Sequence, residues 1–87
     1  MIRESVIEKY LVKKIKSKGG QCVKLTGNLG IPDRMVLLTG FIIFIEVKTL
    51  TGKLTPRQVW WGETIQKLGF KYAIIRSKEE IDQLFSG

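Results

Sequence analysis

The stretch from Asp33 to Lys48, DRMVLLTGFIIFIEVK, decides the fold of this 87-residue chain. It contains two apolar runs on either side of Thr39-Gly40, a pattern that predicts a hairpin of two strands. We expect the first strand from about Asp33 to Leu38 and the second from Phe41 to Lys48. Because the run FIIFI at residues 41–45 is apolar on both faces, the second strand is expected to lie in the interior of a sheet.

The segments on either side of the hairpin alternate between helical and strand patterns. Apolar residues recur at helical spacing over residues 2–18, and a helix over residues 56–68 follows Thr55, a typical N-cap residue. Strands are expected at residues 21–26 and 70–76, with a short last helix over residues 77–85. The order α-β-β-β-α-β-α predicts a single α/β domain over residues 1–87, with a mixed sheet and a right-handed parallel crossover.

The register of the hairpin determines which side chains face one another. If Thr39-Gly40 form the loop, Asp33 lies directly opposite Glu46. Directly opposed side chains have Cβ atoms about 4.5–5.5 Å apart, so two carboxylates there repel unless something compensates. Lys48 lies two residues beyond Glu46 and projects from the same face. Gln58 falls in the first turn of the next helix, beside the strand end where open α/β sheets place ligands.

Two alternatives remain at this point. A glycine bulge at the turn would shift the register by one residue. The acidic residues also fit a structural role, in which Lys48 neutralises Glu46 at the surface and Asp33 is a turn residue after Pro32.

Composition restricts the chemistry that such a site could perform. The chain has 15 Lys plus Arg, 8 Asp plus Glu and no His, which gives a formal net charge of +7. The absence of His excludes a Ser-His-Asp triad and a His-containing zinc site. A lone cysteine, Cys22, excludes an intrachain disulfide and a cysteine zinc site. Catalysis would therefore depend on carboxylates, Lys, Tyr or a hard metal with oxygen ligands.

The positive charge is typical of a protein that binds a polyanion, although a solvated basic surface without a partner remains the alternative. That polyanion is either a nucleic acid or an anionic membrane surface. The sequence contains no apolar stretch long enough to span a bilayer and no secretion signal, so we expect a cytoplasmic protein without membrane contact. The candidate contacts to the backbone of a nucleic acid are basic residues around the acidic pair and on the first helix: Lys13, Lys16, Lys24, Arg34, Lys53 and Arg57.

The motifs around the acidic pair resemble those of the PD-(D/E)xK nuclease superfamily. They are Gly30-Ile31-Pro32-Asp33, Ile45-Glu46-Val47-Lys48-Thr49, Glu8 in the first helix and Thr55-Pro56-Arg57-Gln58 at the start of the next. Within that superfamily the chain is similar to the VRR-NUC family, the virus-type replication-repair nuclease domains, from about residue 4 to residue 84. The resemblance implies a restriction-endonuclease-like α/β fold with an αβββαβ core, a mixed central sheet flanked by helices and a short C-terminal helix.

The same resemblance implies metal-dependent hydrolysis of DNA phosphodiester bonds. Asp33, Glu46 and the backbone carbonyl of Val47 would hold Mg²⁺ or Mn²⁺. Glu8 would contact this metal indirectly or bind a second metal ion. Oxygen ligands of this kind suit Mg²⁺, which keeps several waters and needs only one or two carboxylates.

Two further residues would act on the water and the phosphate in a family member. Lys48 would position or help to deprotonate the attacking water, and Gln58 would steady that water, Lys48 or the scissile phosphate. Small stand-alone members of the family resemble Holliday-junction resolvases, which need two active sites for symmetric incision. This implies a structure-selective endonuclease that acts as a homodimer on branched DNA in replication, repair or recombination, in the host cytoplasm if a virus encodes it.

Two other classes of function remain open from the sequence. One is a non-catalytic DNA-binding module that uses the same basic surface, for which Asp33→Ala would cause no loss of function. The other is a structural subunit whose Trp60 and lysine-rich faces bind protein, and it predicts no DNA binding at low salt.

Overall fold

The expected order of elements is confirmed in the computed structural model, which describes residues 1–86. The expected domain ends at Gly87, which lies outside the described residues. Each element begins or ends within a few residues of its expected bounds. The elements are α1 (Glu4–Ser17), β1 (Gln21–Lys24), β2 (Arg34–Leu38), β3 (Phe41–Val47), α2 (Pro56–Lys67), β4 (Lys71–Ile75) and α3 (Lys78–Leu84).

The four strands form one mixed sheet in the order β1-β2-β3-β4. The pairs β1–β2 and β2–β3 are antiparallel, and the crossover through α2 makes β3 and β4 parallel. The prediction that β3 lies in the interior of the sheet is therefore confirmed. Leu38 pairs with Phe41 across the turn, and Gly40 adopts a left-handed φ of 68°, which glycine tolerates without steric cost. The register expected for a two-residue loop is confirmed, and the shifted register is excluded.

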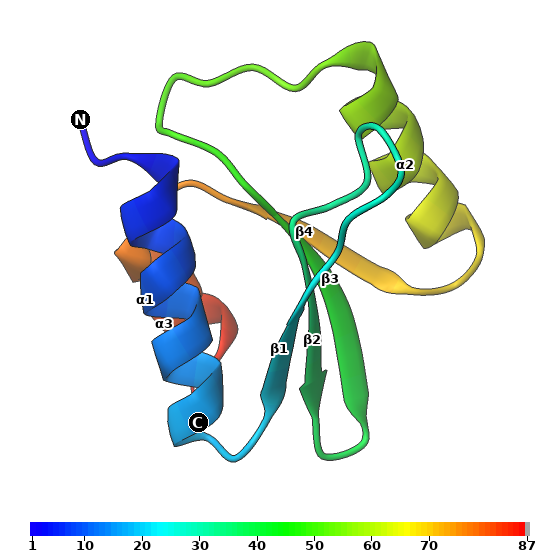
Figure 1. Ribbon diagram of the computed structural model, residues 1–87. Helices are drawn as coiled ribbons and strands as arrows, with labels where there is room; N and C mark the ends of the chain where they lie inside the picture. Colours follow the sequence, from blue (N-terminus) through cyan, green and yellow to red (C-terminus); the bar gives the residue numbers. More distant parts are fainter. Residues whose placement is uncertain (87) are drawn as a thin grey trace.

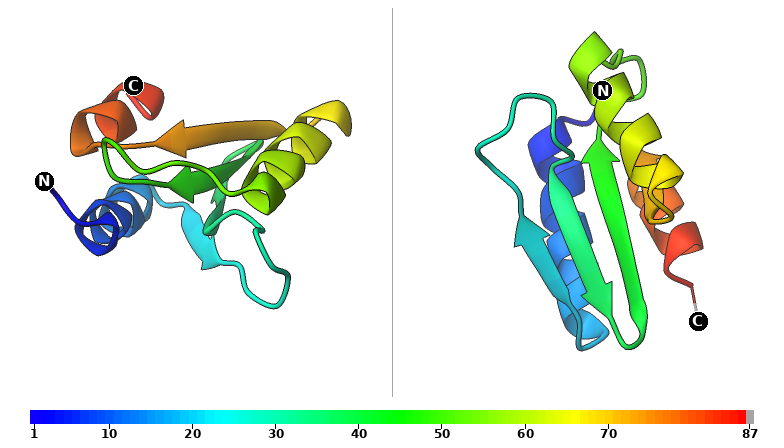
Figure 2. Two further views of the ribbon diagram at one scale, coloured as in Figure 1. Left: turned by 90° about the horizontal axis from the view of Figure 1, so that it is seen from above. Right: turned by 90° about the vertical axis from the view of Figure 1, so that its right-hand side faces the viewer.

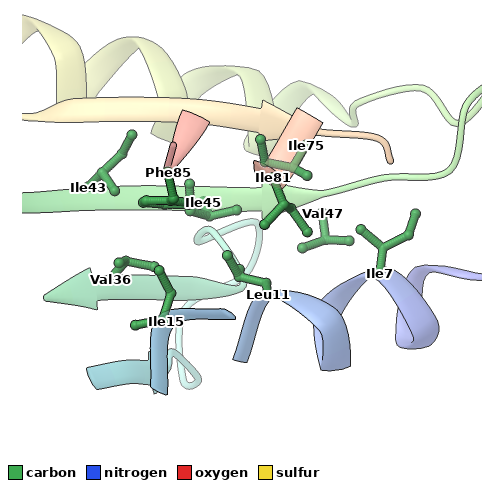
Figure 3. Packing of buried hydrophobic residues seen from close by; sticks show 10 residues of the cluster. All are labelled: Ile7, Leu11, Ile15, Val36, Ile43, Ile45, Val47, Ile75, Ile81 and Phe85. Carbon is green, nitrogen blue, oxygen red and sulfur yellow. The ribbon is translucent and has the colours of Figure 1, made fainter. Parts of the chain in front are cut away.

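The helices cover the two faces of the sheet unequally. In Figures 1 and 2, α1 and α3 lie together on one face, and α2 lies on the other face near the end of β3 that leads to it. Figure 3 shows the core between the sheet and the α1–α3 layer. This core is formed by Ile7, Leu11, Ile15, Val36, Ile43, Ile45, Val47, Ile75, Ile81 and Phe85.

Alternation along β3 assigns its side chains to the two faces. Ile43, Ile45 and Val47 point into the α1–α3 core, so Glu46 and Phe44 point to the α2 side. Among residues 1–86, none of the helices has the length and hydrophobicity that crossing a bilayer requires.

Candidate active site

Asp33 and Glu46 are brought together where β2 begins and β3 ends. The β2–β3 ladder includes the pair Arg34–Ile45, and one further step of the same register places Asp33 opposite Glu46. The Oδ2 atom of Asp33 accepts a hydrogen bond from the backbone N–H of Val47 at 2.8 Å. The Asp33 carboxylate therefore lies against the backbone of β3, next to the residue that carries the second carboxyl group.

The carboxyl group of Glu46 is buried, with only 2% of the residue exposed. Burial is the main cause that raises its pKa from the ordinary value of 4.5 to about 8, and the negative charge of Asp33 is the second cause. The positive charge of Lys48 acts in the opposite direction and lowers this pKa. A buried carboxyl group beside another carboxylate is costly to ionise, and a bound cation would relieve that cost.

Gln58 reaches Glu46 from the first turn of α2. Its Nε2 atom donates to Oε2 of Glu46 at 3.2 Å. The other end of the same amide, Oε1, accepts from the backbone N–H of Thr55 at 2.9 Å, and the Thr55 hydroxyl oxygen accepts from the Gln58 N–H at 3.2 Å. This reciprocal capping box fixes the start of α2 and the orientation of the Gln58 amide together.

Lys48 follows β3 directly, and its backbone N–H donates to the Ile75 carbonyl at 2.9 Å. The loop beyond it is braced by Arg76, whose Nη1 atom donates to the carbonyls of Thr49 at 2.8 Å and Gly52 at 2.6 Å. These hydrogen bonds fix the backbone from which the Lys48 side chain projects and from which the loop to α2 begins. Lys48 is close enough to the acidic pair for its charge to affect Glu46, as expected from their shared face.

Glu8 is placed away from this pair. Its Oε2 atom forms an ion pair with Nε of Arg34 at 2.7 Å, and Nη1 of Arg34 also donates to the carbonyl of Cys22 at 3.1 Å. Arg34 pairs with Ile45 in the ladder, so its side chain lies on the α1 side of the sheet, opposite the face of Glu46. Residues 1–86 contain no group of three or more acidic, Cys or His side chains gathered to hold a metal.

No protein-family model matches the chain. A phage protein with the name "Putative nuclease p44", from Acyrthosiphon pisum secondary endosymbiont phage 1, is 38% identical over 82 residues, which cover 91% of this chain and 88% of that protein. A solved structure described as a VRR_NUC domain superposes with a TM-score of 0.86 and 33% identity, covering 93% of this chain and 91% of the other. The chain belongs to the VRR-NUC family. The family resemblance and the restriction-endonuclease-like fold expected from the sequence are thereby confirmed.

The basic residues expected to contact DNA are divided between separate surfaces of this VRR-NUC domain. Lys53 and Arg57 are exposed beside the start of α2, near Gln58. Lys13 and Lys16 are exposed towards the C-terminal end of α1, about 14 and 18 Å along the helix axis from its first residue, Glu4. Lys24 and Arg34 line a hollow of about 220 Å³ with Ser5, Glu8 and Lys9. Arg34 is the least available of the set, because its side chain is 17% exposed and engaged by Glu8.

Tyr72 is a neighbour of the acidic pair that the sequence analysis missed. Burial is the main cause that raises the pKa of Tyr72 to about 12, and the negative charges of Glu46 and Asp33 act in the same direction. In the parallel ladder Tyr72 pairs with Phe44, which places its side chain on the α2 side of the sheet. Its ring packs against Gly62 of α2, where a Cβ atom would lie 2.7 Å from the ring. The alternation of β4 would have indicated this face once the parallel register was known.

The raised pKa of Glu46 predicts an unusual pH dependence of stability for the metal-free VRR-NUC domain. The folded protein retains a proton that the unfolded chain releases above pH 4.5, so the free energy of unfolding should fall as pH rises from about 4.5 to about 8. Urea unfolding in EDTA across this range measures the effect. Glu46→Gln, which carries no titrating proton, should remove most of the decline; an equal decline in both proteins would contradict the assignment.

Proposed function

We propose that this VRR-NUC protein is a metal-dependent DNA endonuclease that hydrolyses phosphodiester bonds. The observation that carries the proposal is the buried Glu46 carboxyl group, set beside Asp33 and hydrogen-bonded by Gln58. Two carboxylates in one place are unfavourable as anions, and they become favourable as ligands of a hard divalent cation. The family assignment supports the reaction class, since the family is one of nucleases.

The donor set fits Mg²⁺ or Mn²⁺ and does not fit a soft metal. Asp33 and Glu46 supply carboxylate oxygens, and the backbone carbonyl of Val47 at the end of β3 supplies a third oxygen. The chain contains no His, and Cys22 lies in β1 on the other side of the sheet, towards the core. Mg²⁺ usually takes one or two carboxylates and keeps several waters, so a pair of acidic residues is sufficient.

The chain's own residues would divide the work of hydrolysis. Asp33 and Glu46 would hold a divalent metal, which would supply Lewis-acid chemistry by polarising a phosphate oxygen and making a water easier to deprotonate. Lys48 places a positive charge where negative charge accumulates on the phosphate, and it orients or helps to deprotonate the attacking water. Gln58, held by its capping box, steadies that water, Lys48 or the phosphate. Glu8 contributes by an indirect contact or at a second metal, and for this it must exchange its ion pair with Arg34.

The substrate we propose is branched DNA, cut by a homodimer with one site in each subunit. A dimer needs a surface where two copies with a net charge of +7 can approach each other. The hairpin end of the sheet offers such a surface on the α2 side, where no helix of residues 1–86 covers it (Figure 1). We call this uncharged patch the apolar sheet face, and it comprises Val23, Met35, Leu37, Ile42, Phe44 and Phe70.

Exposed apolar residues on this face support the second copy as its occupant. Ile42 is 41% exposed and Phe70 is 51% exposed, and Phe70 packs edge-on against Phe44 with ring centroids 6.3 Å apart. A contiguous apolar patch on a small soluble domain is typical of a protein interface. One exposed lysine, Lys71, borders this face, where it lines a hollow together with Ile42 and Phe70. Charged residues are typical of the solvent-accessible rim of an interface, so this cation is compatible with contact between two copies.

Charge introduced into the apolar sheet face is expected to dissociate the dimer. Ile42→Glu should give a folded monomer, because burying an unpaired carboxylate in an apolar interface costs several kcal/mol. Light scattering coupled to gel filtration measures the mass, and circular dichroism checks the fold. Val6→Glu is the matched control, since Val6 is 42% exposed but lies on α1. A dimer that survives Ile42→Glu would contradict this interface.

Cleavage of a labelled four-way junction tests the proposed function. The wild-type protein is expected to cut the junction with Mg²⁺ or Mn²⁺, to leave a linear duplex of the same sequence largely uncut and to be inactive in EDTA. Asp33→Ala should lose cleavage and retain binding. Binding without cleavage by the wild-type protein would favour a non-catalytic DNA-binding module, and equal cleavage by Asp33→Ala would contradict the proposed site.

A further inference from the structure

Trp60 forms an exposed aromatic surface near the start of α2, the helix that carries Gln58. It is 56% exposed, and with Pro56 and Arg57 it lines a hollow of about 320 Å³ at the start of α2. Isolated exposed hydrophobic residues are common and need no explanation. The Trp60 indole, however, lines a defined hollow together with the Arg57 guanidinium group, and this combination suggests a binding surface.

The indole of Trp60 is held in place by its neighbours. Its ring packs edge-to-face on Trp61, with centroids 5.2 Å apart and an interplanar angle of 84°. Trp61 in turn donates from Nε1 to the backbone carbonyl of Leu29 at 3.2 Å. The adjacent Gly30 lies so close to Arg57 that a Cβ atom there would be 2.6 Å from the Arg57 Cβ. An aromatic ring fixed in this way loses little conformational entropy when a ligand binds.

This surface is built on the two segments that also supply the acidic pair. The loop containing Leu29 and Gly30 leads directly into Asp33. The first turn of α2 places Gln58 against Glu46, and Arg57 precedes Gln58 in the same turn. Trp60 shares a face of α2 with Pro56 and Arg57, about 160° around the helix from Gln58. A strand whose phosphate lies at the acidic pair and whose backbone continues over Arg57 around the start of α2 can reach the Trp60 ring.

We infer that Trp60 stacks an unpaired nucleobase of the DNA substrate while Arg57 contacts the adjoining backbone. Single-stranded nucleic acid is typically bound by aromatic rings on which bases stack, next to cations that follow the phosphates. The apolar sheet face also has an exposed ring, Phe70, with a cation, Lys71, at its border, but it lies at the hairpin end of β3, away from the acidic pair. The inference rests on the proposed function for the path of the strand, and it specifies that the substrate carries unpaired nucleotides near the cut.

Binding measured without cleavage tests the stacking role. Fluorescence anisotropy in EDTA, at one fixed salt concentration, compares a duplex with a single-stranded overhang and a blunt duplex. Trp60→Ala should weaken binding of the overhang DNA about tenfold and leave blunt duplex binding unchanged. Trp60→Phe, which keeps an aromatic face, should retain most of the affinity. Val59→Ala is the control, because Val59 is an exposed apolar neighbour outside the hollow.

Each other outcome would overturn the inference. Unchanged binding by Trp60→Ala, or equal weakening of both DNAs, would contradict base stacking, and so would a wild-type protein that binds neither DNA. A change of mass in light scattering would show that Trp60 contacts protein. Cleavage with Mg²⁺ is measured separately. If the wild-type protein cleaves DNA but Trp60→Ala binds the overhang DNA normally, the stacking role alone is contradicted. If Trp60→Ala selectively loses binding of the overhang DNA but the wild-type protein cleaves no DNA, the nuclease function alone is contradicted.

Discussion

Glu46→Gln is expected to abolish DNA cleavage while the protein stays folded and bound to DNA. Glutamine has nearly the same size as glutamate, and its side-chain oxygen can still accept the hydrogen bond from Nε2 of Gln58. The substitution removes the negative charge with which this buried position would hold a divalent cation. Because a catalytic metal contributes several kcal/mol to transition-state stabilisation, the rate should fall by on the order of a thousandfold.

The rate of cleavage of labelled DNA with saturating Mn²⁺ is the measurement for Glu46→Gln, and DNA affinity in EDTA is its control. Glu63→Gln provides a matched variant, because Glu63 is an exposed carboxylate on the same helix as Gln58 and lies outside the site. Glu63→Gln should cleave at the wild-type rate. Near-normal cleavage by a folded Glu46→Gln protein would remove Glu46 from the mechanism.

Gly30→Ala is expected to lower the free energy of unfolding by about 3 kcal/mol. Gly30 has a left-handed φ of 82°, and an added Cβ would lie 2.6 Å from Cβ and 2.8 Å from the backbone carbonyl carbon of Arg57. Two costs therefore combine: a backbone conformation that alanine rarely adopts, and a collision with the first turn of α2. That loss is a large fraction of the stability of a small domain.

Gly27→Ala separates these two costs, because Gly27 also has a left-handed φ, of 96°, but nothing lies within 4 Å of its added Cβ. Urea unfolding should give a loss of about 1–2 kcal/mol for Gly27→Ala, clearly smaller than for Gly30→Ala. Cleavage by Gly30→Ala should also fall, since the displaced loop leads into Asp33. Equal losses of stability in the two variants would contradict a tight contact between this loop and α2.

The sheet and the acidic pair could be predicted because short-range signals determine them. The two apolar runs and the intervening Thr39-Gly40 fix the hairpin register, and the register alone brings Asp33 opposite Glu46. Gln58 could be located because Thr55 defines the first turn of α2 from the sequence. These signals act within a few residues, so that one chain is enough to detect them.

The placement of Arg34 and Tyr72 depended on longer-range structure. Arg34 follows Asp33 in sequence, but adjacent residues of a strand point to opposite faces, so the Arg34 side chain lies on the α1 side and pairs with Glu8. Tyr72 lies in β4, which pairs with β3 in parallel. The register of these two strands depends on how α2 packs on the sheet, and no turn motif in the sequence indicates it. Helix-to-sheet packing therefore determined the features that the sequence left open.

Binding of Mn²⁺ in the absence of DNA shows whether Asp33 and Glu46 form a metal site on their own. Isothermal titration calorimetry should detect Mn²⁺ binding to the wild-type protein and to Glu63→Gln. It should detect little or none with Asp33→Asn or Glu46→Gln, although both variants remain folded. Equal Mn²⁺ affinity in all four proteins, or none in the wild type, would mean that Asp33 and Glu46 do not form a metal site.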